Sequence, residues 1–480
     1  MFTILRSQKS SRPSRVLCNL VRSYSSLPSS SDVSSFNSFS KSAASALDVD
    51  TTRSFQKPPP TPIPEDDTPL GSILRKTIDA AGPMPLARYM TLCLGHPEHG
   101  YYTTKEDVLG EKGDFITSPE ISQVFGELIA IWLITRWQAN GSPSSVRLLE
   151  LGPGRGTLMA DILRTFKQFS FMAETIQTVD LVESSPVMRE AQKKALEPYL
   201  KRKDGSHVQI RWFDRIEEVP VSDAYTLFSA HEFFDALPIH LLERVPPPLE
   251  PEPSPVTTSP SPENTDLSKP HFHELLVTYT PPSPAFHFTL SVEPTPYSTY
   301  IPTTSAEFEK VEIGQRIEVG AVGFGIMRRL GALLFEGKNA GGGSGLVIDY
   351  GKDGFYSESF RAFKAHAALS PFLTPGLSDL TTNVNFSHLR TALLASPFGS
   401  QIRPLGPISQ ADFLEQMGLI PRVDGLVRGK PDETGKRIRQ GAERLVDREG
   451  MGTEYVFFGL EGKPKEPSQR DNDQAVWPFV

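Results

Sequence analysis

Three glycines at alternate positions, Gly152, Gly154 and Gly156, form the segment of this sequence best suited to bind a ligand. An apolar run at residues 146–151 comes directly before them and predicts a short buried strand, and a helical spacing of apolar residues follows them. Because glycine has no side chain, a ligand can approach the backbone of such a turn closely, and the amino end of the next helix favours an anionic group. The turn therefore predicts a cofactor site between a strand and a helix.

Two classes of cofactor use a turn of this geometry. A dinucleotide site is expected to have Gly-x-Gly-x-x-Gly and an acid about 20 residues later. Here the third glycine comes one residue early, Glu150 precedes the turn, and the next acid at a strand end, Glu183, lies 27 residues after Gly156. The pattern is similar to class I methyltransferases, which use S-adenosylmethionine (SAM). That similarity implies Glu150 beside the methionine end of SAM and Glu183 as acceptor from both ribose hydroxyls. A purely structural strand–helix turn is the alternative, because a glycine turn alone is a weak signal.

A second group of reactive side chains, His231, Glu232 and Asp235, follows the predicted fourth strand at residues 224–228. The carboxyl end of a parallel strand faces the crevice of the sheet where ligands bind. Two carboxylates with the phenylalanines between them suit a guanidinium. A carboxylate binds this group through two parallel hydrogen bonds, and an aromatic face stacks against it. We expect Glu232 or Asp235 to polarise the guanidinium and to accept its proton. His231 is either a base or a hydrogen-bonded structural histidine.

Asp214 is a further candidate for cofactor binding. It follows the predicted third strand at residues 208–213 and could reach the adenine amino group. A solvated loop acid or a helix cap is the open alternative, since acids are usually exposed.

The segment 117–120 has the chemistry of a helix start, with Ser118 as the predicted cap, proline in the first turn and an acid at the positive end. We expect this segment to fold over the SAM site. Asp114, Thr117 and Ser118 would cover the cofactor, with the helix end near its methionine carboxylate. The alternative is an ordinary capped helix packed elsewhere, because the capping pattern would occur in either case.

The elements that must position these residues alternate between strands and helices. Such alternation predicts an α/β fold, with a parallel sheet and helices on both of its faces. We therefore expect a Rossmann-like class I methyltransferase sheet with helical N-terminal and C-terminal additions. The predicted strands are 146–151, 178–182, 208–213, 224–228, 273–279 and 346–350, and the longest predicted helices are 118–140, 186–200 and 320–335.

The composition of the chain argues against a nucleic-acid partner, a metal site and membrane insertion. The net charge of −8 and the isoelectric point near 5.8 argue against a nucleic-acid partner, which would require basic patches. Two cysteines, Cys18 and Cys93, cannot form a disulfide framework or a four-ligand zinc site, and the histidines show no ligand spacing, so we expect no metal. No apolar run approaches the roughly 20 residues of a membrane-spanning helix, so no stable membrane insertion is expected.

The ends of the chain differ in composition from its middle, where 43 prolines in 480 residues also mark segments outside a core. Residues 1–24 are rich in arginine and serine and lack acids, which is typical of a mitochondrial presequence. The remaining predicted regions are a disordered Ser/Pro-rich linker at 25–67, an N-terminal helical region and lid at 68–141, a methyltransferase domain at 142–462 with a Pro-rich insertion at 246–270, and a polar tail at 463–480.

One known family shares five segments with this chain in the same order: 113–122, 149–159, 232–238, 348–351 and 375–381. The chain resembles the MidA-like family of mitochondrial type II protein arginine methyltransferases, which serve as assembly factors of respiratory complex I. The resemblance runs from about Leu70 to about Leu460. It implies symmetric dimethylation of an arginine on a core subunit of complex I, in the matrix, with SAM as cofactor. His231 departs from the asparagine usual in the family, and the insertion is also unusual.

Two other functions stay open at the level of the sequence. A non-catalytic assembly chaperone would keep the fold and bind SAM for stability. An NAD(P)-linked oxidoreductase is disfavoured by the glycine spacing. The target arginine and the oligomeric state do not follow from the residues.

Overall fold

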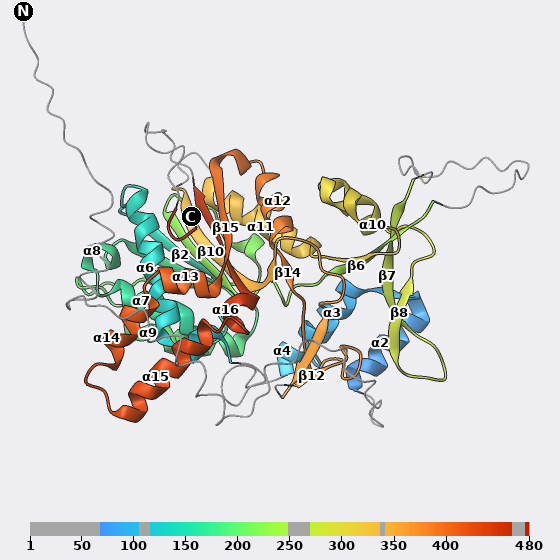
Figure 1. Cartoon of the computed structure of the whole chain (residues 1–480), viewed down its shortest axis with the longest axis horizontal. Helices are drawn as coiled ribbons and strands as arrows, with labels where there is room; N and C mark the ends of the chain where they lie inside the picture. The colour runs from blue at the N-terminus through green and yellow to red at the C-terminus, as the bar shows by residue number, and fades with distance from the viewer. Residues whose placement is uncertain are drawn as a thin grey trace, which may run out of the picture.

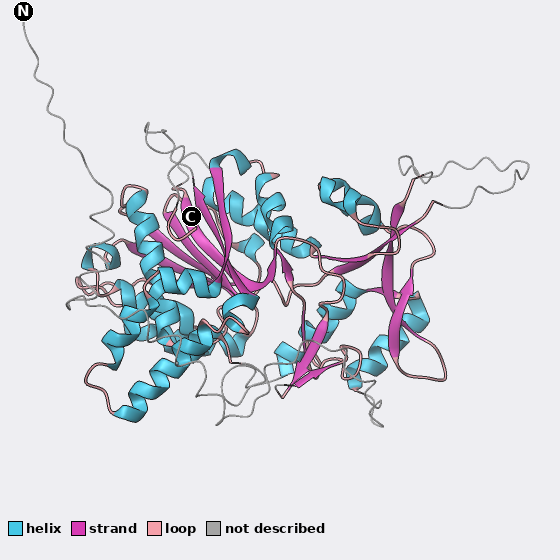
Figure 2. Cartoon of the chain, viewed as in Figure 1, coloured by secondary structure: helices cyan, strands magenta, loops and turns pink. Residues whose placement is uncertain are grey.

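The computed structural model describes residues 68–104, 116–247, 269–336, 341–365, 367–462 and 476–479. The predicted presequence and linker lie outside the described residues, as do Asp114 and most of the insertion at 246–270. Two adjoining bodies make up the described part (Figure 1). One contains a large sheet between layers of helices, and the other contains a smaller sheet with α2, α3 and α10 beside it (Figure 2).

The large sheet has the order β15-β16-β10-β5-β2-β3-β4. Strands β4, β3, β2, β5 and β10 are parallel, whereas β16 runs antiparallel to both of its neighbours, and the short β14 pairs with the end of β10. The predicted parallel sheet is thus confirmed. Its strands are β2 Val146–Leu151, β3 Ile176–Val182, β4 Gln209–Phe213, β5 Tyr225–His231, β10 Gly343–Lys352, β14 Val384–Asn385, β15 Ile402–Ser409 and β16 Tyr455–Gly462.

Helices cover both faces of this sheet because successive strand residues point to opposite sides. Leu148 packs with α6 and α7 in one core cluster, and its neighbour Leu149 packs with α11 and α12 in another. The helices on the first face include α6 Gln123–Ala139, α7 Thr157–Phe166, α8 Ser170–Ala173, α9 Pro186–Leu200 and α13 Gln410–Gln416, and those on the second are α11 Ala321–Phe335 and α12 Phe386–Leu394.

The smaller sheet is antiparallel and is inserted between β5 and β10. Helices α2 and α3 pack against it in a core of their own. The structure therefore divides the N-terminal region differently from the expected 68–141 unit, because α2 and α3 join the inserted sheet while α6 joins the large one. The elements are α2 Pro69–Ala81, β1 Met84–Pro85, α3 Leu86–Gly95, β6 His240–Val245, β7 His271–Tyr279, β8 Phe286–Leu290, α10 Pro296–Tyr300 and β9 Arg316–Val319.

A third, three-stranded sheet lies between the two bodies, close to α4 (Figure 1). The carboxyl-terminal helices α14 and α15 pack beside α6 and α5. The remaining elements are α4 Tyr101–Thr104, α5 Ser118–Ile121, β11 Arg361–Lys364, β12 Ala367–Leu369, β13 Asp379–Thr381, α14 Leu419–Val427, α15 Asp432–Leu445, α16 Met451–Glu454 and the 3-10 turns Ile216–Glu218, Ile301–Thr304, Ala306–Lys310 and Gly399–Gln401.

The described end of the predicted polar tail packs against the core. The indole N–H of Trp132 donates to the carbonyl of Trp477 at 3.1 Å, and the ring of Phe479 lies 5.9 Å from those of Trp132 and Phe413. Composition alone suggested a solvated tail, but the apolar residues at 476–479 have a site on α6. Within the described ranges, no helix is both long and apolar enough to cross a membrane, and no three potential ligands gather into a metal site.

Candidate active site

The glycine turn stands where the order of the large sheet reverses, since β3 and β4 follow β2 on one side and β5 lies on the other. Ligands of open α/β sheets bind at such a switch point. Gly152, Gly154 and Gly156 have φ angles of 62°, 51° and 83°, which glycine adopts without strain. A Cβ added at Gly152 would lie 2.8 Å from Phe233 Cδ2, so this position also has no room for a side chain.

Glu150 lies next to the last residue of β2, and one oxygen of its carboxylate accepts no hydrogen bond from the described residues. Its carboxylate is buried in the wall of the pocket that the glycine turn also lines, and burial raises its pKa to about 8. Among the described residues, no donor reaches its Oε2. Buried carboxylate oxygens are normally hydrogen-bonded, so this oxygen fits a donor group on a ligand.

Glu183 is connected to the glycine turn through Gln192. The Gln192 amide donates to the Gly154 carbonyl at 2.7 Å and to Glu183 Oε2 at 3.2 Å, and its own oxygen accepts from the Trp212 indole at 2.8 Å. Glu183 Oε1 accepts the backbone N–H of Ser185 at 2.8 Å. Gln192 is fully buried and was missed by sequence reasoning. The sequence did contain a signal for Gln192, because this polar residue lies at the helical spacing of the buried face of α9.

Asp214 is not among the residues that line this pocket. Its side chain is 64% exposed and forms an ion pair with Arg189 at 2.5 Å. Glu183 is also absent from that lining. Arg189 donates from Nε to the Glu183 carbonyl at 2.7 Å and thereby links Asp214 to Glu183, so the adenine contact and the solvated loop acid both stay predictions.

The end of β5 brings His231 to the same pocket, and the segment after it brings Glu232 and Asp235. Glu232 has a φ of 48°, in the left-handed region that side chains other than glycine rarely adopt. Its Oε1 accepts the hydroxyl of Tyr455 at 2.9 Å and lies 3.3 Å from His231 Nε2. Burial and the charge of Asp235 raise the pKa of Glu232 to about 8, whereas burial lowers the pKa of His231 to about 3. His231 is therefore neutral and a poor base.

Asp349 fixes the backbone of this segment from the neighbouring strand β10. Its Oδ2 accepts the backbone N–H groups of Phe233, Phe234 and Asp235 at 3.2, 2.9 and 3.2 Å. The side chain is fully buried. Sequence reasoning noted Asp349 only within a family motif and gave it no role, although an acid that ends an apolar strand was a usable signal.

The helix start at 117–120 also reaches the pocket, but its cap differs from the predicted one. Thr117, with extended backbone, caps α5, and Ser118 is the first helical residue. The prediction of Ser118 as cap was wrong because the helix begins one residue earlier than assumed. Thr117 and Glu120 line the pocket together with Glu150 and Gly152, whereas Ser118 is not part of this lining. That the segment covers the cofactor stays a prediction. The backbone N–H of Ser118 donates to Glu232.

The pocket as a whole is acidic and partly aromatic. Carboxylates come from the large body and from the three-stranded sheet, where Asp379 of β13 accepts the hydroxyl of Tyr102 at 2.8 Å. The hydroxyl of Thr381 donates to Asp235 at 2.8 Å. The acids and aromatic residues that line the pocket are Tyr102, Glu120, Glu150, Glu232, Asp235, Tyr350, Phe363 and Asp379. Such a lining favours cationic ligands.

The parallel sheet with one reversed strand, together with the glycine turn at its switch point, defines the class of the protein as a SAM-dependent methyltransferase. Residues 128–400 match the model of a family described as "Putative S-adenosyl-L-methionine-dependent methyltransferase". A protein from Burkholderia thailandensis with bound S-adenosyl-homocysteine has the same fold, with a TM-score of 0.62, 22% identity, and 82% of this chain and 91% of that chain covered. The predicted fold class and the SAM cofactor are confirmed.

Curated relatives then specify the family. The zebrafish (Danio rerio) protein named "Protein arginine methyltransferase NDUFAF7, mitochondrial" is 36% identical over 401 residues, which cover 81% of this chain and 85% of that protein. The human (Homo sapiens) protein of the same name is 34% identical over 409 residues, which cover 82% and 83%. The chain belongs to this family of protein arginine methyltransferases, and the resemblance seen in the sequence is confirmed.

Proposed function

We propose that this chain is a protein arginine N-methyltransferase that produces symmetric dimethylarginine on a core subunit of mitochondrial complex I during its assembly. The observation that carries the proposal is the joining of the glycine turn and a cluster of carboxylates and aromatic rings in one pocket. A guanidinium is a planar cation that binds carboxylates through paired hydrogen bonds and stacks on aromatic rings. The names of the relatives support the same activity.

The residues around the glycine turn fit SAM. The turn offers close backbone approach, Glu150 has an acceptor oxygen without a donor, and Gln192 holds Glu183 at the end of β3. We propose that Glu150 accepts from the amino group of the methionine part and that Glu183 accepts from the ribose. When bound, SAM supplies an electrophilic methyl group on a sulfonium centre.

Glu232 and Asp235 are proposed to hold the guanidinium and manage its proton. An arginine side chain is protonated below pH 12, so a carboxylate must turn one nitrogen toward the methyl group and neutralise the charge. With SAM bound, the nitrogen would form its bond to the methyl carbon as the bond from that carbon to sulfur breaks and the sulfur leaves as a thioether. The proton lost by the nitrogen would pass to the ionised carboxylate of Glu232. The ionised carboxylate of a glutamate with a pKa near 8 is a stronger base than that of an ordinary glutamate with a pKa near 4.5, although a smaller share of it is ionised at neutral pH. Tyr455 and the N–H of Ser118 keep Glu232 oriented.

Methyl transfer to purified core subunits of complex I tests this function. Full-length protein is incubated with SAM labelled in the methyl group and with each subunit, and the labelled subunit is hydrolysed for amino-acid analysis. Symmetric dimethylarginine is expected, and Glu232→Gln should abolish it. Label on another amino acid, or asymmetric dimethylarginine, would contradict the proposal. SAM binding without label in any subunit would favour the non-catalytic chaperone.

We also propose import into the mitochondrial matrix through residues 1–24. Both relatives are named mitochondrial, and the segment has the composition of a presequence. Amino-terminal sequencing of the protein recovered from mitochondria should give a mature terminus downstream of Arg22. A terminus at Met1 in a cytosolic fraction would refute import.

A further inference from the structure

The connection between β8 and β9, residues 291–315, exposes large apolar side chains that take no part in the pocket. Val292 is 90% exposed, Tyr300 68% and Tyr297 46%. Single exposed apolar residues are common, but these three fall within nine residues on α10 and the turn before it. Tyrosine is also among the residues enriched at protein interfaces.

A buried polar network fixes one of these rings. Glu274 is fully buried, with Oε1 2.6 Å from His240 Nδ1 and with Oε2 accepting the hydroxyl of Thr295 at 2.6 Å. The His240 ring stacks against Tyr297 with centroids 3.7 Å apart and planes at 25°. Thr295 in turn caps α10. Burying an ionisable pair is costly, and this one lies on the inserted sheet, away from the pocket lining. The network holds the Tyr297 ring in one orientation, and the part of the ring that His240 does not cover is exposed to solvent.

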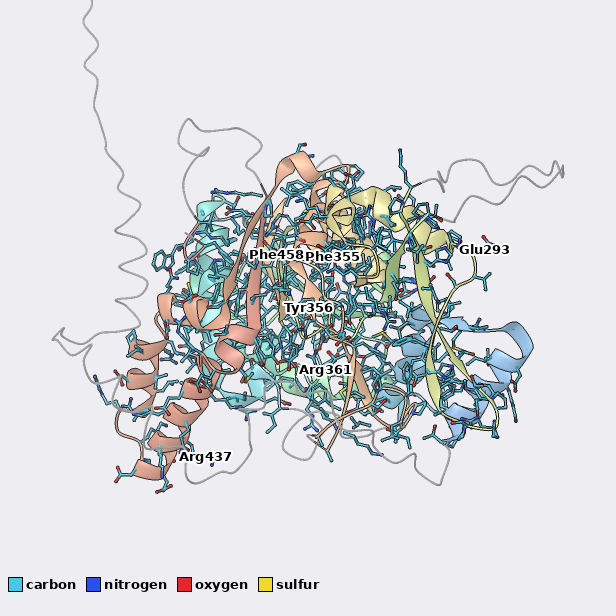
Figure 3. All side chains as sticks on the ribbon, turned by 45° about the vertical axis from the view of Figure 1, so that its right-hand side comes forward. Glu293, Phe355, Tyr356, Arg361, Arg437 and Phe458 are labelled. Atoms are coloured by element: carbon cyan, nitrogen blue, oxygen red, sulfur yellow. The ribbon has the colours of Figure 1, made fainter. Side chains whose placement is uncertain are left out.

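The segment that carries these rings has a net negative charge. Residues 291–315 contain four glutamates and one lysine, and Glu293, Glu309 and Glu312 are exposed. Figure 3 shows Glu293 at the outer edge of the molecule, whereas Tyr356 and Arg361 lie in its middle. Arg361 belongs to the surroundings of the pocket, because its charge acts on Asp235. The aromatic and acidic surface is therefore separate from the pocket.

We infer that Val292, Glu293, Tyr297 and Tyr300 form a docking surface for a positively charged region of the protein substrate, distinct from the pocket that receives its arginine. The inference rests on the proposed function. Tyrosine faces and carboxylates together suit lysine and arginine side chains of a partner. A pre-ordered ring loses little freedom on binding, which favours affinity. Because two linked contacts bind more strongly than either alone, a whole subunit should bind more tightly than a short peptide around its arginine.

The test compares the labelled complex I subunit with a short synthetic peptide that spans its methylated arginine. In the double variant Tyr297→Ser, Tyr300→Ser, the KM for the subunit should rise roughly tenfold or more, as for loss of central interface tyrosines. The kcat and the KM for the peptide should stay unchanged. Tyr297→Phe keeps the ring and should restore subunit binding, and Glu293→Gln should weaken the salt dependence of the KM. The matched control is Val221→Ser with Ile420→Ser, which removes similarly exposed apolar side chains from the large body.

Several results would overturn the inference. An unchanged KM for the subunit excludes the surface, and an equal rise for subunit and peptide indicates a general defect. A loss of mass by light scattering in the double variant would assign the surface to a second copy of this chain. If no subunit accepts label, the proposed function fails, and binding of the same recombinant subunits by biolayer interferometry still tests the surface. Equal binding by wild type and the double variant would then refute it.

Discussion

At the scale of single residues, the acids of the pocket are shaped mainly by burial. Glu150 and Glu232 both have a pKa near 8, and burial is the first cause in each, but only Glu232 also has a second carboxylate beside it. The two acids also differ in their partners. Glu232 accepts hydrogen bonds from Tyr455 and Ser118, whereas Glu150 keeps a free oxygen. These partners agree with the roles proposed above, with Glu232 held in place as the proton acceptor and Glu150 open to a donor of the cofactor.

The pH dependence of methyl transfer should follow Glu232. With SAM saturating, kcat/KM for the protein substrate is expected to rise with pH and level off at or below about 8, because only the ionised carboxylate accepts a proton and the sulfonium charge lowers its pKa. Glu232→Gln should lower kcat by about two to four orders of magnitude and remove this limb of the pH profile. Glu150→Gln should raise the KM for SAM and leave the limb in place. A limb that persists in Glu232→Gln would assign the base elsewhere.

Gln192 should act as a positioning residue for the cofactor. Gln192→Leu keeps the volume but removes its bonds to Gly154 and Glu183, so SAM affinity should fall by roughly tenfold, the equivalent of about 1.4 kcal/mol. Calorimetry with S-adenosyl-homocysteine measures the change. Gln410→Leu is the matched control, because Gln410 is also buried and donates to the carbonyl of Leu445 at 2.8 Å. Equal losses of affinity in both variants would mean that stability alone explains the effect.

At the scale of elements, local patterns predicted the strand–turn–helix unit and most of the parallel sheet correctly. The run at 146–151 and the helix at 186–200 have the same limits in the structure. The inserted antiparallel sheet was not predicted, because its strand β7 pairs with β1 from the N-terminal region, and no local pattern records a pairing partner that distant. The break between α5 and α6 at Ser122 was missed for a different reason, since the apolar spacing continues across it.

The residues of the candidate site also fall into those that the sequence predicted and those that it missed. Glu150, Glu232 and Asp235 were predictable because Glu150 lies near the end of a strand that reaches the crevice and the other two follow such a strand. Gln192 and Asp349 were missed, because their sequence signals do not say which backbone groups the two side chains face after folding. The sequence therefore predicts residues at strand ends and misses the residues that orient them.

Asp349 links β10 to the segment after β5, and its removal should disable that segment. Asp349→Ala leaves three backbone N–H groups without an acceptor, and each unsatisfied buried group costs about 1–3 kcal/mol unless water or rearrangement satisfies it. We expect kcat to fall by about two orders of magnitude, as for other misplaced catalytic groups, with a smaller change in SAM affinity. Asp353→Ala is the control, because Asp353 lies just beyond β10 and its exposed side chain pairs with Arg390. Wild-type kcat in Asp349→Ala would contradict this role.

At the scale of the whole molecule, the buried acids make the stability of the fold depend on pH. The pKa values of Glu150 and Glu232 are about 8 in the folded protein against 4.5 as a reference, so the folded state binds more protons than the unfolded chain between these values. The free energy of unfolding therefore decreases as the pH rises toward 8. Burial lowers the pKa values of His231 and His388 to about 3 and about 4, so their effect is confined to lower pH.

Thermal unfolding without SAM should show this dependence directly. The Tm is expected to fall between about pH 6.5 and 8.5, where the two glutamates lose their protons and the histidines no longer titrate. The double variant Glu150→Gln, Glu232→Gln should flatten the curve over this range. Scanning calorimetry in buffers of equal ionic strength provides the measurement. A slope that is the same in the variant would place the proton release on other groups.

Strand β16 has a consequence for when the large sheet can form. It lies between β10 and β15, yet it follows every other strand in the order of the chain. Until residues 455–462 have left the ribosome or a translocation channel, β10 and β15 present open edges to each other with no strand between them, and open edges invite pairing with other chains. The sheet can therefore close only once residues 455–462 are free, and residues 476–479 then seat on α6. A chain held at residue 454 should remain dependent on chaperones, and its release should be followed by a single late gain of protease resistance.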